Sequence, residues 1–219
     1  MTGALLLVAA GGLARETAQA AAAGGVDVLG YLDDDPAMVG VELDGAPVLG
    51  SSVSVGRYAE ASLVLCAGRG AVREQLARRL AEHGAGDERY ARVVHPSVQL
   101  AATCEVATGS ILLAGVVLTA SVRVGRHVVV MPHVTLTHDD VVADYATLCA
   151  GVQLGGAVSI GRGAYLGMGA VVREGVSVGE GAVVGMGSVL TRDVPPGQTW
   201  WGVPARQQAE RALRAASPS

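Results

Sequence analysis

The chain has few aromatic residues and little net charge. Phenylalanine is absent, and aromatic residues make up 3% of the 219 residues, so a core must be built from Val, Leu, Ile and Ala. Such a core suits a repetitive fold with a narrow interior. The formal net charge is -4 and the isoelectric point is near 5.7, which leaves no positive field to attract nucleic acid or an anionic membrane surface. We therefore expect neither partner.

Cysteine is also scarce. The three cysteines are odd in number and show no CxxC spacing, which argues against disulfides and against a zinc cluster. We expect no metal. A short apolar run near the N-terminus has no basic residue before it, which predicts a buried strand rather than a signal peptide or a membrane span. We expect a cytoplasmic protein.

Residues 1–90 alternate apolar runs with amphipathic stretches. This alternation is typical of β-α-β units and predicts a small Rossmann-like α/β domain with a parallel sheet. The expected strands are 5–9, 26–32 and 62–67, and the expected helices are 13–23, 53–60 and 71–83.

Residues 91–206 follow a six-residue repeat. Every sixth residue from Val94 to Leu190 is aliphatic, at seventeen positions without a break. One inward aliphatic side chain per six residues predicts a parallel β-helix with three faces and eighteen residues in each coil. The residue after the aliphatic one is often glycine, as at 155 and 167, and we expect this glycine to relieve the turn at the corner. Residues 207–219 are predicted to form a short C-terminal helix and tail.

Several segments together resemble one family. The hexads and the segment GVPAR at 202–206 are similar to the hexapeptide-repeat acyltransferases. The segments AAGGLARE at 9–16, GYLDDDP at 30–36 and DGAPVLGS at 44–51 resemble the sugar acetyltransferases of the NeuD/PglD type. This resemblance implies a left-handed β-helix, acetyl-CoA as co-substrate, and N- or O-acylation of an amino sugar, a nucleotide-linked sugar or a sugar-like acceptor. A natural-product acceptor without a nucleotide is an alternative.

Acyl transfer from a thioester needs a base for the proton of the acceptor and a donor for the tetrahedral oxyanion. His138 is followed by Asp139, whose carboxylate could orient the imidazole, although an exposed polar corner would look the same. Gly156 comes one coil later, so we expect it beside His138, as an oxyanion donor or as a plain corner glycine. The resemblance implies that His138 is the base, because family members carry His followed by Asp or Glu here.

Small residues on later coils are candidates for a CoA groove. We expect them on the same face as Gly156, where an extended pantetheine arm could approach the backbone closely. Arg206 would lie near the adenosine end. The other candidates are Gly167, Met168, Gly185 and Met186, where methionine packing is the alternative reading.

The N-terminal domain offers candidates for an acceptor site. Gly11 and Gly12 open a helix after a strand, so free N–H groups could receive a phosphate, although a tight turn would need the same residues. Asp33 and Asp34 follow the second strand, where similar enzymes hold a nucleotide. Leu13 stands where the family usually has His, so we expect weak binding of UDP or CMP, or none.

Two further positions depart from the family pattern. Met131 and Thr147 stand where Asn and a second His are common, and we expect both near the reacting centre.

A zinc enzyme is the rival hypothesis. His133 and His138 have the H-x4-H spacing with which γ-class carbonic anhydrases bind zinc on a similar prism, but their third His would fall at Ser97. For either activity, the small-residue face of the prism predicts a homotrimer with active sites between protomers.

Overall fold

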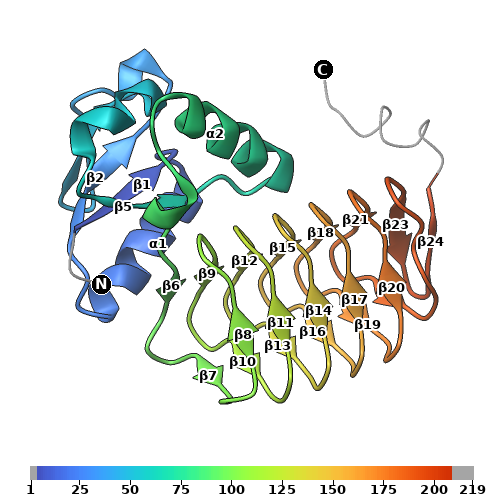
Figure 1. The fold of residues 1–219 in the computed structure, drawn as a ribbon. Coiled ribbons are helices and arrows are strands. Elements are labelled where there is room, and N and C mark those ends of the chain that lie inside the picture. Colours follow the sequence, from blue (N-terminus) through green and yellow to red (C-terminus); the bar gives the residue numbers. More distant parts are fainter. Residues whose placement is uncertain (1–3, 209–219) are drawn as a thin grey trace.

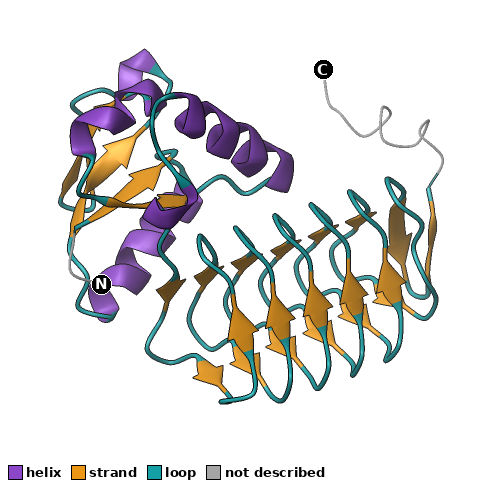
Figure 2. Ribbon diagram, in the orientation of Figure 1, coloured by secondary structure: helices purple, strands orange, loops and turns teal. Residues whose placement is uncertain are grey.

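The computed structural model describes residues 4–208 and contains two parts, an α/β domain and a long three-sided prism (Figure 1). Figure 2 shows that the helices all lie in the first part, whereas the prism is made of short strands and turns. The predicted C-terminal helix falls almost entirely outside the described residues, and Gln207 ends the last strand. No helix within residues 4–208 has the length and apolar character needed to cross a membrane.

The N-terminal domain is a twisted sheet with strand order β3-β4-β2-β1-β5, parallel except at β3. Its centre is β1, because all four of its apolar residues are fully buried. Helix α1 packs on one face of the sheet, and α2 with η2 packs on the other. The elements are β1 (Leu5–Val8), α1 (Gly12–Ala23), β2 (Val28–Leu32), η1 (Pro36–Met38), β3 (Glu42–Leu43), β4 (Ala46–Gly50), η2 (Ser52–Tyr58), β5 (Ser62–Leu65), α2 (Gly70–Glu82) and η3 (Asp87–Arg89).

The predicted strands and helices of this domain lie within a few residues of the observed ones. Two features differ from expectation. The segment predicted as a helix at 53–60 forms a 3₁₀ helix, η2, and the hairpin of β3 and β4 had not been predicted. Both strands of that hairpin are only partly buried, so they lack the continuous apolar run that marks a buried strand.

The prism is a parallel β-helix of two-residue strands, each hydrogen-bonded to the strand one coil before and after it. Its first face holds β6 (Val93–Val94), β9 (Ile111–Leu112), β12 (Val129–Val130), β15 (Thr147–Leu148), β18 (Tyr165–Leu166) and β21 (Val183–Val184), then β23 (Thr199–Gly202) and β24 (Ala205–Gln207). Its second face holds β7 (Gln99–Leu100), β10 (Val117–Leu118), β13 (Thr135–Leu136), β16 (Gln153–Leu154), β19 (Val171–Val172) and β22 (Val189–Leu190). Its third face holds β8 (Glu105–Val106), β11 (Arg123–Val124), β14 (Val141–Val142), β17 (Ser159–Ile160) and β20 (Ser177–Val178).

The corners of the prism are named after the faces they join: corner 1–2, corner 2–3 and corner 3–1. The hexad aliphatics fill the interior as predicted. The glycine that follows some of these aliphatics has a different role from the one expected. A Cβ on Gly155 would lie 2.6 Å from the backbone nitrogen of Glu174 in the next coil, so glycine is needed there for close approach of the coils. The turn itself uses positive φ two residues later, as at Asp139 with φ 64°.

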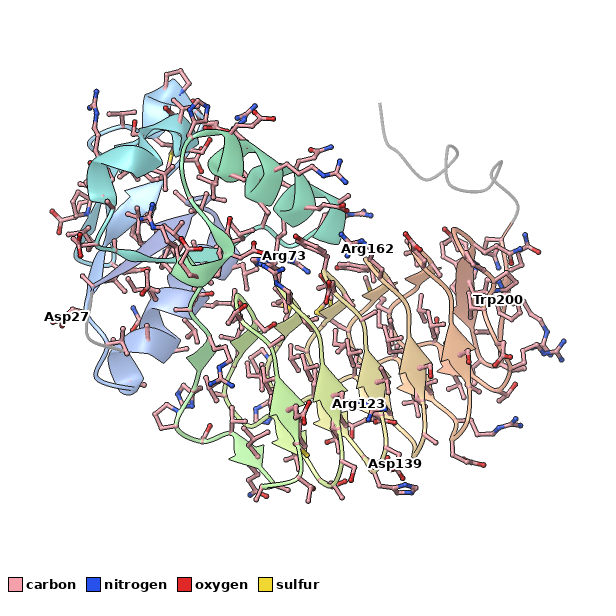
Figure 3. All side chains as sticks on the ribbon, viewed as in Figure 1. Asp27, Arg73, Arg123, Asp139, Arg162 and Trp200 are labelled. Carbon is pink, nitrogen blue, oxygen red and sulfur yellow. The ribbon has the colours of Figure 1, made fainter. Side chains whose placement is uncertain are left out.

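The first face of the prism packs against the N-terminal domain. Val93, Ile111 and Val129 of this face are buried in one apolar cluster with residues of α1 and β1. Beside this cluster, Arg73 of α2 is fully buried between the two parts (Figure 3). Its guanidinium donates to the carbonyl oxygens of His127, Ala67, Gly68, Tyr145 and Ala146, and to Thr147 Oγ1, at 2.7–3.1 Å. One side chain thus links the two domains.

Candidate active site

His138 and Asp139 form the turn at corner 2–3, directly after β13. The Nδ1 atom of His138 lies 2.9 Å from Oδ2 of Asp139, and both side chains are about two-thirds exposed, at 66% and 64%. A carboxylate on Nδ1 favours the tautomer that carries its proton there. The Nε2 atom is then left as the basic nitrogen.

Gly156 lies directly beside this imidazole, one coil further along. A Cβ added to Gly156 would stand 2.3 Å from Nε2 of His138, so only glycine leaves room for the ring in this position. Among residues 4–208 the N–H of Gly156 has no hydrogen-bond acceptor. The corner thus holds a free imidazole nitrogen and an unused backbone donor next to each other.

Asp140, which the sequence reasoning did not select, is buried beneath this corner. Its carboxylate accepts from the backbone N–H of Thr137 and of Val158, each at 2.8 Å. Burial raises the pKa of Asp140 to about 6. The side chain therefore ties the His138 turn to the next coil. The sequence did contain a signal for this role, because Asp140 places a carboxylate at an inward position that small residues fill in the other coils.

The candidates for the CoA groove lie elsewhere on the protomer. Met168 and Met186 sit at corner 1–2 and are 54% and 72% exposed, together with Gly167 and Gly185. The expectation of one shared face with Gly156 was wrong, because twelve residues from 156 to 168 make two faces rather than a whole coil. Arg206 lies in β24, paired with Trp201 of β23, at the C-terminal end of the prism.

The acceptor candidates gather at the carboxyl edge of the N-terminal sheet. Gly11 caps α1 without a side-chain hydrogen bond, and Gly12 begins the helix. Asp33 accepts from the N–H of Ala10 at 2.7 Å. Asp34 accepts from the N–H and hydroxyl of Ser52 and pairs with Arg79. Both carboxylates therefore brace the domain internally.

The three residues that depart from the family pattern lie together, on the side of the prism away from His138. Leu13 and Met131 pack against the same apolar cluster between α1 and the first face. Thr147 is buried on that face, where its hydroxyl donates to Gly68 O at 2.8 Å. Within the protomer, Met131 and Thr147 lie away from His138, because strands β12 and β15 belong to the first face and His138 to corner 2–3. Their place near the reacting centre stays a prediction.

The two histidines of the zinc hypothesis also occupy different corners. His133 lies at corner 1–2 against Gly115, whereas His138 lies at corner 2–3 against Gly156. Residues 4–208 contain no cluster of three or more His, Cys, Asp or Glu side chains able to hold a metal ion. The hydroxyl of Ser97, at the place of the third ligand, instead accepts from the N–H of Gly115 at 3.0 Å.

A third histidine, His127, is buried at corner 3–1. Its ring stacks on Tyr145 with centroids 5.0 Å apart and meets the edge of Tyr90 at 4.5 Å. Neither ring nitrogen has a hydrogen-bond partner in the described part of the chain. Burial, assisted by the charges of Arg126 and Arg73, lowers the pKa of His127 to about 4 from 6.5. The imidazole is therefore neutral in the folded protein at neutral pH.

This depressed pKa predicts a pH-dependent stability. The unfolded chain gains the proton below about pH 6.5 and the folded protein only near pH 4, so the contribution of His127 to stability is lost as the pH falls through this window. The loss amounts to about 3 kcal/mol.

We expect the difference in unfolding free energy between the wild type and His127→Asn to shrink by this amount from pH 7 to pH 4 in urea titrations. Asn suits the positive φ of this position, and taking the difference cancels the opposing contribution of Asp140. A constant difference across this range would contradict the assignment.

Comparison with known proteins agrees with this architecture. The model of the PglD N-terminal domain matches residues 4–80, and that of the bacterial transferase hexapeptide (six repeats) matches residues 157–192. No curated protein matches the chain.

Solved structures are similar over nearly the whole length. A variant of perosamine N-acetyltransferase from Caulobacter crescentus, in complex with CoA and GDP-perosamine, has a TM-score of 0.88 and 28% identity over 96% of this chain and 99% of that one. The acetyltransferase domain of PglB from Neisseria gonorrhoeae, in complex with acetyl coenzyme A, has a TM-score of 0.85 and 26% identity over 93% and 98% of the two chains. WeeI from Acinetobacter baumannii has a TM-score of 0.82 and 26% identity over 94% and 100%.

The predicted fold, an α/β domain followed by a left-handed β-helix, is thereby confirmed. This chain thus combines a PglD N-terminal domain with bacterial transferase hexapeptide repeats, and over nearly its whole length it is similar to sugar acetyltransferases of the NeuD/PglD type.

Proposed function

We propose that this protein transfers the acetyl group of acetyl-CoA to the amine of an amino sugar or a sugar-like acceptor. The observation that carries the proposal is the corner at which His138, bonded through Nδ1 to Asp139, turns Nε2 toward Gly156. Two similar proteins support the proposal, because the Caulobacter enzyme was solved with CoA and GDP-perosamine and the Neisseria domain with acetyl coenzyme A.

In this mechanism the amine nitrogen attacks the thioester carbonyl carbon while Nε2 of His138 accepts a proton from the nitrogen. Asp139 stabilises the imidazolium that forms. The N–H of Gly156 donates to the tetrahedral oxyanion. When the intermediate collapses, the C–S bond breaks and the imidazolium returns the proton to the CoA thiolate. The acetylated amide and free CoA are the products.

The binding roles follow from the same proposal. Gly167, Met168, Gly185 and Met186 would flank the pantetheine arm, with Arg206 near the adenosine. Gly11, Gly12 and the turn of Asp33 and Asp34 would border the acceptor.

The experiment that tests the proposal follows free thiol release from acetyl-CoA with a panel of amino sugars and their hydroxyl counterparts. We expect release with amine acceptors and mass spectra of N-acetylated products. Release that depends on a hydroxyl acceptor would move the assignment to O-acylation. No release with any acceptor, together with carbon dioxide hydration that a zinc chelator abolishes, would favour the carbonic-anhydrase hypothesis.

A trimer is part of the proposal, because the base and the acceptor edge lie apart in one protomer. Asp139 stands at the edge of the prism farthest from the N-terminal domain (Figure 3), while the acceptor candidates border the first face. A neighbouring copy that brings its corner 2–3 to the acceptor candidates would complete the site. We expect sedimentation at micromolar concentration to give three times 22.0 kDa. A monomer that is fully active would contradict this arrangement.

Nucleotide affinity is expected to be low, because Leu13 is apolar where the family has a polar partner. Leu13 packs against the apolar cluster, as Met131 does, so a phosphate placed there would lose hydration without a side-chain partner. We expect titration calorimetry to detect weak or no binding of UDP and CMP, with Leu13→His increasing it. Tight binding by the wild type would instead indicate that the acceptor is a nucleotide-linked sugar. The same apolar wall favours, as second candidate, a natural-product acceptor without a nucleotide.

A further inference from the structure

The loop at residues 66–69 presents one arginine between the two domains. It follows β5 at the carboxyl edge of the N-terminal sheet, the edge where open α/β sheets bind ligands. Two of its carbonyls are fixed: Gly68 O accepts from Thr147 Oγ1 at 2.8 Å, and Ala67 O accepts from Arg73 Nη1 at 2.7 Å. The backbone of Arg69 is therefore held in place, while its side chain is exposed.

The guanidinium of Arg69 rests on an aromatic ring of the prism. Its carbon Cζ lies 5.3 Å from the ring centroid of Tyr165, within the range of cation–π attraction. Tyr165 opens β18, one coil beyond Thr147 of β15. The ring thus holds the guanidinium between the N-terminal domain and the first face of the prism.

No carboxylate among the described residues pairs with the guanidinium of Arg69. In the described part of the chain its side chain has no carboxylate within ion-pair distance and donates no hydrogen bond. The acids of the same edge, Asp33 and Asp34, are occupied by the N–H of Ala10 and by Ser52. By contrast, ion pairs engage Arg78 and Arg79 of α2 and Arg126 and Arg162 of the prism. A planar cation that is oriented and unpaired suits an oxyanion ligand.

We propose that Arg69 selects the acceptor by binding an anionic group, a phosphate or a carboxylate, on the amine-bearing substrate. This inference rests on the proposed acetyl transfer and extends it to the class of acceptor. Arg69 supplies a polar anchor, which the apolar side chain of Leu13 cannot supply. Amino sugars that carry a phosphate or a carboxylate but no nucleotide are then preferred over uncharged ones.

The test compares Arg69→Gln and Arg69→Lys with Arg57→Gln, an exposed arginine of η2 without an ion pair among the described residues. Inorganic pyrophosphate is the binding probe in calorimetry. We expect Arg69→Gln to weaken its binding about 10- to 100-fold, Arg69→Lys to restore part of it, and Arg57→Gln to leave it unchanged. Failure of the wild type to bind pyrophosphate, or equal binding by Arg69→Gln, would overturn the proposal.

Kinetics then separates phosphate from carboxylate. Glucosamine, glucosamine 6-phosphate and muramic acid are compared as amine acceptors. We expect Arg69→Gln to raise KM for the charged acceptor that is used, while kcat and the KM for glucosamine change little. A uniform rise in KM for all three would contradict anion selection. If no amine is acetylated but pyrophosphate still binds through Arg69, the proposed function fails and the anion site stands.

Discussion

Replacing His138 by alanine is expected to lower kcat for acetyl transfer by about 10²- to 10⁴-fold, the usual contribution of a general base. The dissociation constant for CoA should change little, because the imidazole acts on the acceptor proton and not on the CoA arm. Asp139→Asn should cost less, since it removes the charge that orients Nδ1 but leaves Nε2 beside Gly156. Steady-state kinetics together with CoA calorimetry would measure both quantities.

His133→Ala is the matched control for this experiment. His133 is also an exposed histidine that rests on a glycine of a neighbouring coil, Gly115. Its ring has no hydrogen bond to a carboxylate among residues 4–208. We expect this variant to keep its activity within a few fold. Equal losses from both substitutions would support a shared zinc site, and an active His138→Ala enzyme would refute the proposed base.

The local structure of the prism could be predicted from the sequence because one aliphatic residue recurs at a short, constant spacing. An aliphatic side chain at every sixth position can only be buried if the backbone turns three times per coil. Each predicted position therefore ends a strand, as Val94 ends β6 and Leu190 ends β22. The neighbourhood of His138 and Gly156 followed in the same way, because eighteen residues return the chain to the same corner.

The site beyond that pair could not be predicted from spacing alone. Met168 is an exception, because its separation of twelve residues from Gly156 spans two faces and not a whole coil, so spacing alone places it at another corner. The role of Asp140 depends on two backbone N–H groups of different coils, and no pattern of side chains reveals those partners. His127 and Arg73 gain their surroundings only when the two domains pack. Contacts of this kind join residues more than fifty positions apart, as for Arg73 and His127 O.

The second large effect is expected at this domain junction. Arg73→Met keeps a long side chain but removes six hydrogen bonds, three of them buried and three partly buried. Burial already lowers the pKa of Arg73 to about 10, so the guanidinium is still charged at neutral pH and is neutralised by carbonyl dipoles rather than by a carboxylate. Buried acceptors left without a donor each cost about 1–3 kcal/mol. We expect the unfolding free energy to fall by about 3–5 kcal/mol in urea titrations.

Arg78→Met provides the control, because Arg78 lies on the same helix but is 74% exposed and pairs only with Glu74 four residues before it. An exposed pair of this kind contributes less than about 0.5 kcal/mol. Arg73→Lys should recover only part of the loss, since an ammonium group has three donors and cannot reach acceptors on both domains in the fork geometry of a guanidinium. Equal stability of Arg73→Met and Arg78→Met would mean that water replaces the guanidinium at the junction. The apolar cluster of Val93, Ile111 and Val129 would then hold the two domains together by itself.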